Sequence, residues 1–365
     1  MSQFLGFGSG KNGTVPASGT INTYAAMTAT AGDQTVTTAL VVAVGDVVLL
    51  HQTQHATAAG VWELVQVLSF GAGTFEAISN LVNSYSAGAQ AILVPQYRGG
   101  ILSGAVTGTV WNGTVGGIIA LMSNGNLTIS GSITATGLGF RGGAGVNSSS
   151  GKQGEGTVGA GDTVSASANG NGGGGGTYVG GQGASGGGGG GHAFIGSPGT
   201  KEGNAPDPVG AGGGVSGSTD LTTMTFGGGG GSGGAGGSAT SGAGGNGGGI
   251  IFVIGATITL SGTITVSGAA SGTGTGTSVW AGSGSGAGGS VFIKSQVATL
   301  GTSLITANAG AYSGSGGEAN VGDGGVGAVG RIRVEACSRT GTTNPSASES
   351  VGGHAFCGSV AQIIG

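Results

Sequence analysis

The sequence has very little charge. Of 365 residues only 9 are lysine or arginine and 13 are aspartate or glutamate, and the formal net charge is −4. A chain with so few cations has no basic surface to neutralise phosphates, so nucleic acid is not an expected partner. Charge-driven disorder is a poor interpretation too, because 37% of the residues are hydrophobic. We expect a chain that collapses or assembles.

Proline, cysteine and long apolar runs are scarce as well. With 6 prolines and no strict glycine at every third position, collagen is excluded. The longest apolar runs, 39–50 and 250–260, fall short of the roughly 20 residues that cross a bilayer, and the N-terminus lacks a secretory-signal pattern. We expect neither membrane insertion nor classical export. Cys337 and Cys357 could form one disulfide, which the sequence alone leaves open.

Glycine is what the sequence has in excess. Its 94 residues concentrate between 141 and 249, in runs such as Gly172–Gly176, Gly186–Gly191 and Gly227–Gly231. A segment without side chains is either a flexible linker or a layer held by hydrogen bonds between its own peptide groups. Apolar residues recur through this segment, and it interrupts a repeat rather than joining two domains. Both features favour a layer of packed polyglycine II helices, which have three residues per turn.

Residues 1–98 have the composition of a conventional β-domain, with short runs of β-branched and aromatic residues between turn residues. We expect a sandwich or small barrel that serves attachment or assembly. Its strand candidates are Val36–Val44, Val47–Gln52, Val61–Leu68, Thr74–Ile78 and Gln90–Val94.

A repeat of about 40 residues follows this domain. Glycine-led apolar strands begin at Gly249, Gly289 and Gly330, with an earlier copy at Gly117, and Thr-rich second strands follow the copies at 117, 249 and 289. Strands that recur at a fixed period are typical of a β-solenoid. The sequence therefore predicts an all-β protein with an N-terminal domain (1–98), a first solenoid coil (99–140), a glycine-rich polyglycine II insertion (141–249), further coils (250–336) and a C-terminal cap (337–365).

These features resemble the glycine-rich tail-fibre and adhesin proteins of tailed bacteriophages. The resemblance rests on Phe7–Gly13, on the phrase Gly137–Gly143 and on the long glycine runs, and covers about residues 100–335. In the detachable adhesins of some T-even phages, the glycine-rich domain is a sandwich of polyglycine II helices, and loops between the helices touch the receptor. The resemblance implies a virion protein made in the host cytoplasm. This chain departs from those adhesins by its large N-terminal domain and by the position of its glycine runs inside β-repeats.

Few residues have side chains suited to catalysis, metal binding or recognition. His51 and His55 lack further metal ligands beside them, so we expect no metal site and no cofactor. Most carboxylates stand in glycine-rich segments, where we expect solvated turn residues and no catalysis. The candidates are Glu155, Asp162, Glu202, Asp207, Asp220, Glu318 and Asp323.

The phrase Gly-His-Ala-Phe occurs at 191–194 and 353–356. As loop residues on a rigid scaffold, the candidate receptor contacts are Tyr178, His192, Phe194, Lys201 and Asp207. We expect Trp62, Trp111 and Trp280 in the core or at an interface.

The expected function is that of a non-enzymatic tail fibre or tail-tip adhesin that binds a host receptor, either a protein or a glycan. Its expected partners are copies of itself, in a trimer or polymer, and other tail proteins, because a chain with little side-chain volume gains by sharing edges. Two alternatives stay open. One is a self-assembling extracellular filament subunit of a bacterium or archaeon. The other is an ice- or surface-binding module with Thr-rich faces such as Thr257, Thr259, Thr263 and Thr265.

Overall fold

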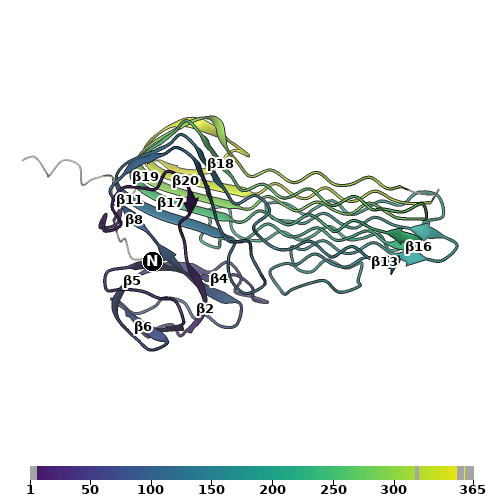
Figure 1. Ribbon diagram of the computed structural model, residues 1–365, viewed down its shortest axis with the longest axis horizontal. Helices are drawn as coiled ribbons and strands as arrows, with labels where there is room; N and C mark the ends of the chain where they lie inside the picture. The colour runs from purple at the N-terminus through teal and green to yellow at the C-terminus, as the bar shows by residue number, and fades with distance from the viewer. Residues whose placement is uncertain (1–5, 317–319, 352–356, 358–365) are drawn as a thin grey trace, which may run out of the picture.

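The computed structural model describes residues 6–316, 320–351 and 357, and these residues form strands and extended segments without any helix. Accordingly, nothing in this part of the chain is a helix long and apolar enough to cross a bilayer. Figure 1 shows three parts: a small barrel, a curved sheet beside it, and a long slab of extended segments that leaves the sheet. The all-β class expected from the sequence is confirmed.

Six antiparallel strands close into the barrel in the order β2-β3-β6-β5-β4-β7. Their bounds are β2 (Tyr24–Ala29), β3 (Thr35–Thr38), β4 (Val47–Gln52), β5 (Trp62–Gly71), β6 (Thr74–Ala77) and β7 (Ala89–Val94). Strand β4 is buried along its whole length. Because side chains alternate along a strand, Val48 and Leu50 enter the barrel core, whereas Val47 and Leu49 pack toward the sheet. The expected N-terminal barrel is therefore present.

The prediction of one barrel strand is wrong in part. The run Val36–Val44 was expected to be continuous, but β3 ends at Thr38. The Thr38 hydroxyl donates to the Ala26 carbonyl and accepts from the Leu40 N–H, so the chain turns away from the ladder at this point. Val41 then lies 86% exposed in the following loop. Val41 and Val44 are thus surface residues, whereas Val42 packs partly buried against the barrel core from this loop.

The second part is an eleven-stranded sheet in which all strand pairs are parallel. Its long strands are β11 (Ile118–Ile129), β17 (Ile250–Leu260), β19 (Ser290–Thr306) and β20 (Arg331–Asn344). The short ones are β1 (Gly19–Thr20), β8 (Gln96–Tyr97), β9 (Gly100–Leu102), β10 (Ala105–Thr107), β12 (Ser132–Thr134), β18 (Thr263–Thr265) and β21 (Ser348–Val351).

The long strands pair at the spacing of the sequence repeat. Ile250 lies opposite Ser290, and Ser290 lies opposite Arg331, so the register follows the intervals of 40 and 41 residues. Ile118 pairs with Ile250 across the long insertion. The sheet curves like a half-barrel, however, and does not close into clear solenoid coils. Its concave side encloses a core of aliphatic residues such as Leu121, Ile251 and Ile293.

The outer edges of the sheet are formed by short segments. At one edge the N-terminal segment lies along β8–β10, where the Val15 N–H donates to the Gly99 carbonyl (3.0 Å) and the Gly104 N–H to the Ala17 carbonyl (2.7 Å). At the other edge the short strand β21 pairs with Arg333–Ala336 of β20. Short edge strands offer fewer free peptide groups to another strand.

The slab consists of extended, nearly straight segments, here called rows. It is built from residues 137–249, which include the expected insertion 141–249, and also from 266–289, 307–316 and 320–330, which leave one sheet strand and return to the next. The later excursions of the repeat therefore belong to the same body as the long insertion. Figure 1 shows the rows running side by side away from the sheet.

The row of residues 186–191 lies at the centre of the slab, and its backbone shows a period of three. Gly186 and Gly189 donate to the row at 197–200, Gly187 and Gly190 to the row at 282–285, and Gly188 and Gly191 to the row at 171–174. Its carbonyls accept, with the same period, from the rows at 210–213, 325–328 and 228–231. The central row is thus bonded to six neighbouring rows at N···O distances of 2.8–3.0 Å.

Glycine is required in these rows because neighbouring backbones touch where a side chain would stand. A Cβ at Gly188 would lie 2.0 Å from the Ala211 carbonyl oxygen, and one at Gly190 would lie 2.0 Å from the Gly228 oxygen. The rows around 227–232 and 282–288 also bond to six neighbours each. The buried peptide groups of the slab are thereby satisfied without a side-chain core.

A third core joins barrel, sheet and slab. Trp62 of the barrel packs edge-on against Phe252 and Phe292, which stack on each other with ring centroids 5.0 Å apart. Trp111 packs against Phe140 and Phe226.

Residues 218–226 hold the barrel to the base of the slab. The Trp62 indole donates to the Leu221 carbonyl (2.8 Å), and the Met224 N–H donates to the Gly60 carbonyl (2.8 Å). The three parts therefore form one packed unit.

The close contacts between rows give a direct test of the slab. We expect Gly188→Ala to lower the free energy of unfolding by about 1–3 kcal/mol, because the added methyl group forces two backbones apart. The matched control is Gly159→Ala, where nothing lies within 4 Å of the added Cβ. That change should be neutral or stabilising by up to about 1 kcal/mol. Equal denaturant midpoints for the two variants would contradict a close-packed slab.

Candidate functional site

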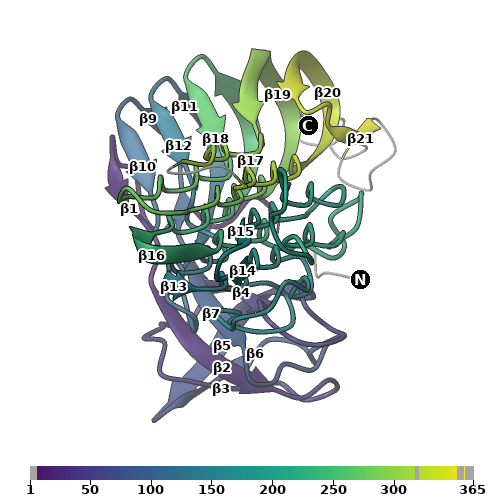
Figure 2. The same ribbon diagram turned by 90° about the vertical axis from the view of Figure 1, so that its right-hand side faces the viewer.

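The end of the slab far from the sheet, here called the tip, carries short antiparallel strands. Strand β13 (Asn147–Ser149) pairs with β16 (Ala235–Thr240), and β14 (Tyr178–Val179) pairs with β15 (Gly183–Ala184). Figure 2 views the molecule from this end, with these strands nearest the reader. The rows reverse direction here, so the tip is a cluster of turns on a rigid support.

A hollow of about 260 Å³ opens among these turns. Its lining combines an aromatic ring, two side-chain amides, a hydroxyl and glycine backbone: Tyr178, Gly181, Gln182, Gly183, Gly236, Gly237, Ser278, Val279 and Asn320. Glycine at 236 allows the Tyr178 ring to rest on the backbone, since a Cβ there would lie 2.1 Å from a ring atom. Glycine at 183 likewise leaves room for the Asn320 carbonyl.

The polar groups of the hollow are only partly used inside the protein. The Asn320 Oδ1 accepts from the Asn204 N–H (2.9 Å), and its carbonyl accepts from the Ala184 N–H (3.1 Å), so this residue is held in place with φ at 66°. Within the described residues, the Asn320 Nδ2, the Gln182 side-chain amide and the Tyr178 hydroxyl make no hydrogen bond. These groups can therefore bond to a ligand in the hollow.

Three of the five predicted contact residues gather near this hollow. Tyr178 lines it directly. Lys201 and Asp207 form an exposed ion pair with each other in the loop that also contains Asn204. A second contact ties this loop to the tip, because the Thr177 hydroxyl donates to the Pro208 carbonyl (2.6 Å).

The other two predicted contacts lie at the base of the slab. His192 was expected to be a surface contact, but it is fully buried where its row meets the sheet, and its Nε2 lies 3.3 Å from the Ser290 hydroxyl. That expectation is wrong for His192, because the row ends inside the packed junction. Phe194 follows in the turn and is 66% exposed. The second Gly-His-Ala-Phe phrase, at 353–356, lies outside the described residues.

The tryptophans occupy the places expected of packing residues. Trp111 is buried, and Trp62 lies in the core between barrel and sheet. Trp280 lies half-buried at the tip, where Cβ atoms at Gly274 and Gly316 would collide with its ring. The indole therefore rests on glycine backbone from two neighbouring turns.

The described histidines, cysteines and carboxylates form no group of three that could hold a metal ion. His51 is buried in β4, with its Nε2 2.7 Å from the Met224 carbonyl and its Nδ1 2.9 Å from the Thr53 hydroxyl. Because a carbonyl only accepts, the ring carries its proton on Nε2. Burial lowers the pKa of His51 to about 4, and burial together with the charge of Arg331 lowers the pKa of His192 to about 3. Both rings are neutral structural groups near pH 7.

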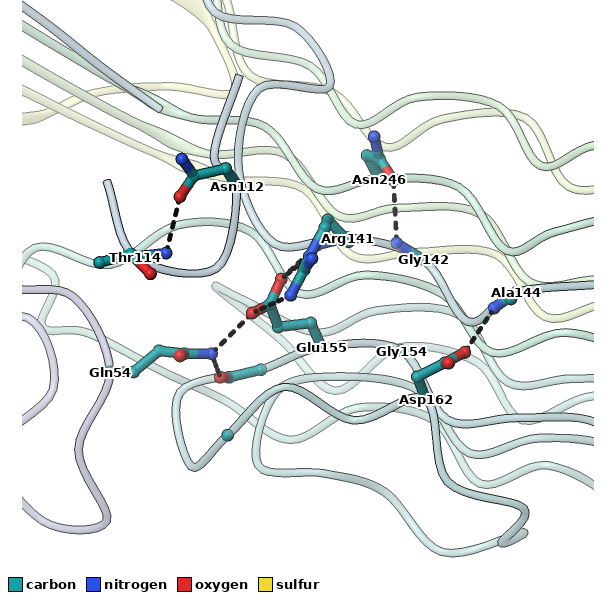
Figure 3. A network of polar contacts seen from close by, with 12 residues as sticks. Gln54, Asn112, Thr114, Arg141, Gly142, Ala144, Gly154, Glu155, Asp162 and Asn246 are labelled. Atoms are coloured by element: carbon teal, nitrogen blue, oxygen red, sulfur yellow. Dashed lines mark hydrogen bonds and ion pairs between the residues drawn. The ribbon is translucent and has the colours of Figure 1, made fainter. Parts of the chain in front are cut away.

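Glu155 differs from the solvated turn residue that the sequence suggested. Its carboxylate is buried and accepts from the Arg141 Nε (2.9 Å), the Arg141 backbone N–H (3.0 Å) and the Gln54 Nε2 (3.0 Å). Figure 3 shows this cluster, which joins two rows of the slab to the barrel loop that carries Gln54. Asp162, close by, pairs with Lys152 at the surface. Every oxygen of Glu155 is thus used to hold the three segments together.

The two cysteines are bonded. Cys337 in β20 and Cys357 have an S–S distance of 2.09 Å and a Cα–Cα distance of 5.5 Å. The bond attaches a residue near the C-terminus to the last long strand of the sheet. It lies away from the tip and plays no part in the hollow.

Sequence reasoning missed Gln182, Ser278 and Asn320, which line the hollow together with Tyr178. They come from turns that are far apart in the chain, and nothing in one sequence shows that these turns meet. A usable signal was the aromatic residues that interrupt the glycine runs, such as Tyr178 and Trp280. They mark the ends of rows, where side chains have space.

The buried Glu155 cluster can be tested against the exposed pair beside it. We expect Glu155→Gln to lower the free energy of unfolding by about 1–3 kcal/mol, because hydrogen bonds to a buried charge are lost. Arg141 is half exposed and stays hydrated, which keeps the loss below that of a fully buried pair. Asp162→Asn is the control, with an expected change under about 1 kcal/mol. The reverse order of the two losses would contradict this assignment.

Protonation of His51 should weaken the junction in acid. Between pH 6.5 and about pH 4 the histidine of the unfolded chain binds a proton and the folded one does not, so stability falls as pH falls. Each such histidine contributes a slope of up to about 1.4 kcal/mol per pH unit. We expect His51→Gln, whose amide can still donate to Met224, to show a shallower decline in denaturant midpoint over this range. An unchanged slope would show that His51 is not the group responsible.

Comparison of the chain with protein-family models, with curated proteins and with solved structures gave no match.

Proposed function

We propose that this chain is a non-enzymatic structural protein of a virion, a tail fibre or tail-tip adhesin that binds a host-surface receptor through the tip of the slab. The supporting observation is the glycine lattice, in which the central row bonds to six neighbours with a period of three. Such a lattice is a stiff support that carries a cluster of turns away from the rest of the chain. Binding residues on loops held by a rigid scaffold are the usual arrangement for recognition.

The lattice fits polyglycine II helices in particular. A period of three residues means that successive peptide groups point in three directions, which is the geometry of a helix with three residues per turn. In the same proposal the parallel sheet is an incomplete solenoid, with coils that consist of one sheet strand and one pair of rows. Sheet and slab would then be two halves of a single repeating unit.

The barrel is the part proposed to attach to other tail proteins or to further copies of this chain. It lies at the opposite end from the tip (Figure 1). Its outer surface exposes large apolar side chains, among them Val41, Val44 and Phe70. Exposed apolar residues that gather in one region are frequent at protein interfaces. The localisation proposed with this role is the virion tail, after synthesis in the host cytoplasm.

A filament subunit is a weaker proposal for this fold. Growth by strand addition needs a free edge at each end of the sheet. Here the N-terminal segment bonds along β8–β10, and β21 pairs with β20. A further strand would have to add to these short edge segments, which offer few free peptide groups.

A surface-binding role has one specific observation in its favour. Thr20, Thr107, Thr134, Thr265 and Thr306 lie in register across neighbouring strands. Such a ladder repeats hydroxyl groups at the strand spacing of about 4.8 Å, which could order water. Cross-strand threonine pairs also stabilise sheets, so the ladder has a structural explanation. Thermal hysteresis of the purified protein would favour an ice-binding role over the adhesin.

The adhesin proposal can be tested with the labelled full-length chain and a broad panel of bacteria. We expect saturable binding to some cells and at least a tenfold loss in affinity, about 1.4 kcal/mol, for Gly180→Arg. A Cβ at Gly180 meets only the Tyr178 hydroxyl, at 3.8 Å, so the change enlarges the tip without straining it. Gly159→Arg, where the added Cβ also meets open space, is the matched control away from the tip. Equal loss in both variants, or cell binding that neither alters, would contradict a receptor site at the tip.

A further inference from the structure

We propose that the hollow at the tip binds a neutral sugar, namely one terminal residue of a surface glycan. This inference rests on the proposed function and specifies its ligand. Its basis is the meeting of Tyr178, Gln182, Ser278 and Asn320 around a space of about 260 Å³. That volume lies just below the roughly 300–1,000 Å³ usual for ligand sites and suits one ring-sized group better than an extended molecule.

The lining has the chemistry that a sugar requires. A sugar ring presents a face of C–H bonds and a rim of hydroxyl groups, each both a donor and an acceptor. The Tyr178 ring supplies apolar area with a polar end, and its position is fixed because it rests on Gly236. The amides of Gln182 and Asn320 supply donors together with an acceptor, and can bond to neighbouring hydroxyls of one ring.

Two of these side chains are available and held in place. Asn320 is anchored through its Oδ1 and its carbonyl, while its Nδ2 has no partner within the described residues. Among the described residues the Ser278 hydroxyl bonds to Ser238 alone, at 3.2 Å from the Ser238 hydroxyl. A ligand would therefore replace water at polar groups without breaking strong internal bonds. Such preorganisation reduces the entropy lost on binding.

The lack of net charge around the hollow favours a neutral ligand over a charged one. None of the described lining residues is ionised, and the two charges of the neighbouring loop, Lys201 and Asp207, neutralise each other. Glu318, two positions before Asn320 in the sequence, lies outside the described residues. A phosphorylated or acidic glycan would leave its charge without a counter-ion in the hollow. A cationic peptide would meet the same difficulty. The hydrogen-bonding groups are all neutral donors and acceptors, as hydroxyl groups require.

The first test uses immobilised neutral oligosaccharides with terminal hexoses or N-acetylhexosamines as probes for the full-length chain. We expect Tyr178→Ala to weaken binding at least tenfold and Gln182→Ala about threefold to tenfold, the loss of about one neutral hydrogen bond. Tyr178→Phe, which keeps the ring on Gly236 and removes only the hydroxyl, should lie between wild type and Tyr178→Ala. The control is Tyr312→Ala, an exposed tyrosine outside the lining. Sugar binding that survives Tyr178→Ala and Gln182→Ala would overturn the assignment to this hollow.

The second test separates the sugar from the proposed function. Cells that bind the labelled chain are treated either with periodate, which destroys vicinal diols, or with protease. Loss of binding after periodate and retention after protease would support the sugar. Binding that survives periodate but is lost after protease, and still falls in Gly180→Arg, would overturn the sugar while leaving the adhesin proposal intact. Cell binding that Gly180→Arg leaves unchanged would overturn both.

Discussion

Direct contact between peptide groups of different rows is the interaction on which the rest of the structure depends. Each row residue loses roughly 1–2 kcal/mol of backbone entropy on ordering, and one peptide hydrogen bond returns about 1 kcal/mol net. A single row is therefore unstable alone. Order becomes possible only because the central rows bond to six neighbours and because buried backbones, as at Gly188 and Gly190, approach closely enough for dispersion to add to the bonds. Glycine, which usually weakens regular structure, permits the closest of these contacts, and small residues such as Ser283, Ser285 and Ala287 occupy other buried row positions.

The sheet supplies what the rows lack, namely side chains that set their positions. Residues 250–260, 290–306 and 331–344 pair in register at the repeat spacing, with aliphatic residues buried on one side of the sheet. On the other side Phe252 and Phe292 of the first two strands stack on each other. Between these strands the chain runs out along one row and back along another. The rows that leave or enter a sheet strand are thus fixed at that end by a strand with a hydrophobic core. A slab of glycine alone would have many equivalent registers; attached to this sheet, it has one.

The repeat and the glycine runs allowed much of this to be predicted, and the failures have physical causes. The strands after Gly249, Gly289 and Gly330 were identifiable because apolar side chains alternate with a fixed spacing. The prediction of a strand over Val36–Val44 was wrong beyond Thr38, because a hydrophobic run does not reveal where a side-chain hydroxyl forms hydrogen bonds that end the strand. The prediction of His192 as a surface contact was wrong, because a residue beside a glycine run is expected to lie in an exposed loop. In the slab the glycine runs are instead the buried part of the structure. The hollow was beyond prediction, since Gln182, Ser278 and Asn320 meet only through row packing.

The same constraint decides where such a protein can carry out recognition. Inside the slab a large side chain would separate the rows, and buried side chains in its central rows are small, such as Ser283 and Ser285. The buried carboxylate of Glu155 is used in bonds that hold row to row and row to barrel, and His51, in barrel strand β4, bonds to the Met224 carbonyl. Where rows reverse and the lattice ends, larger side chains have space and their polar atoms can meet a ligand. The tip with Tyr178 and Gln182 is such a place, at the end of the slab far from the sheet (Figure 1), which is why the proposed binding site lies there.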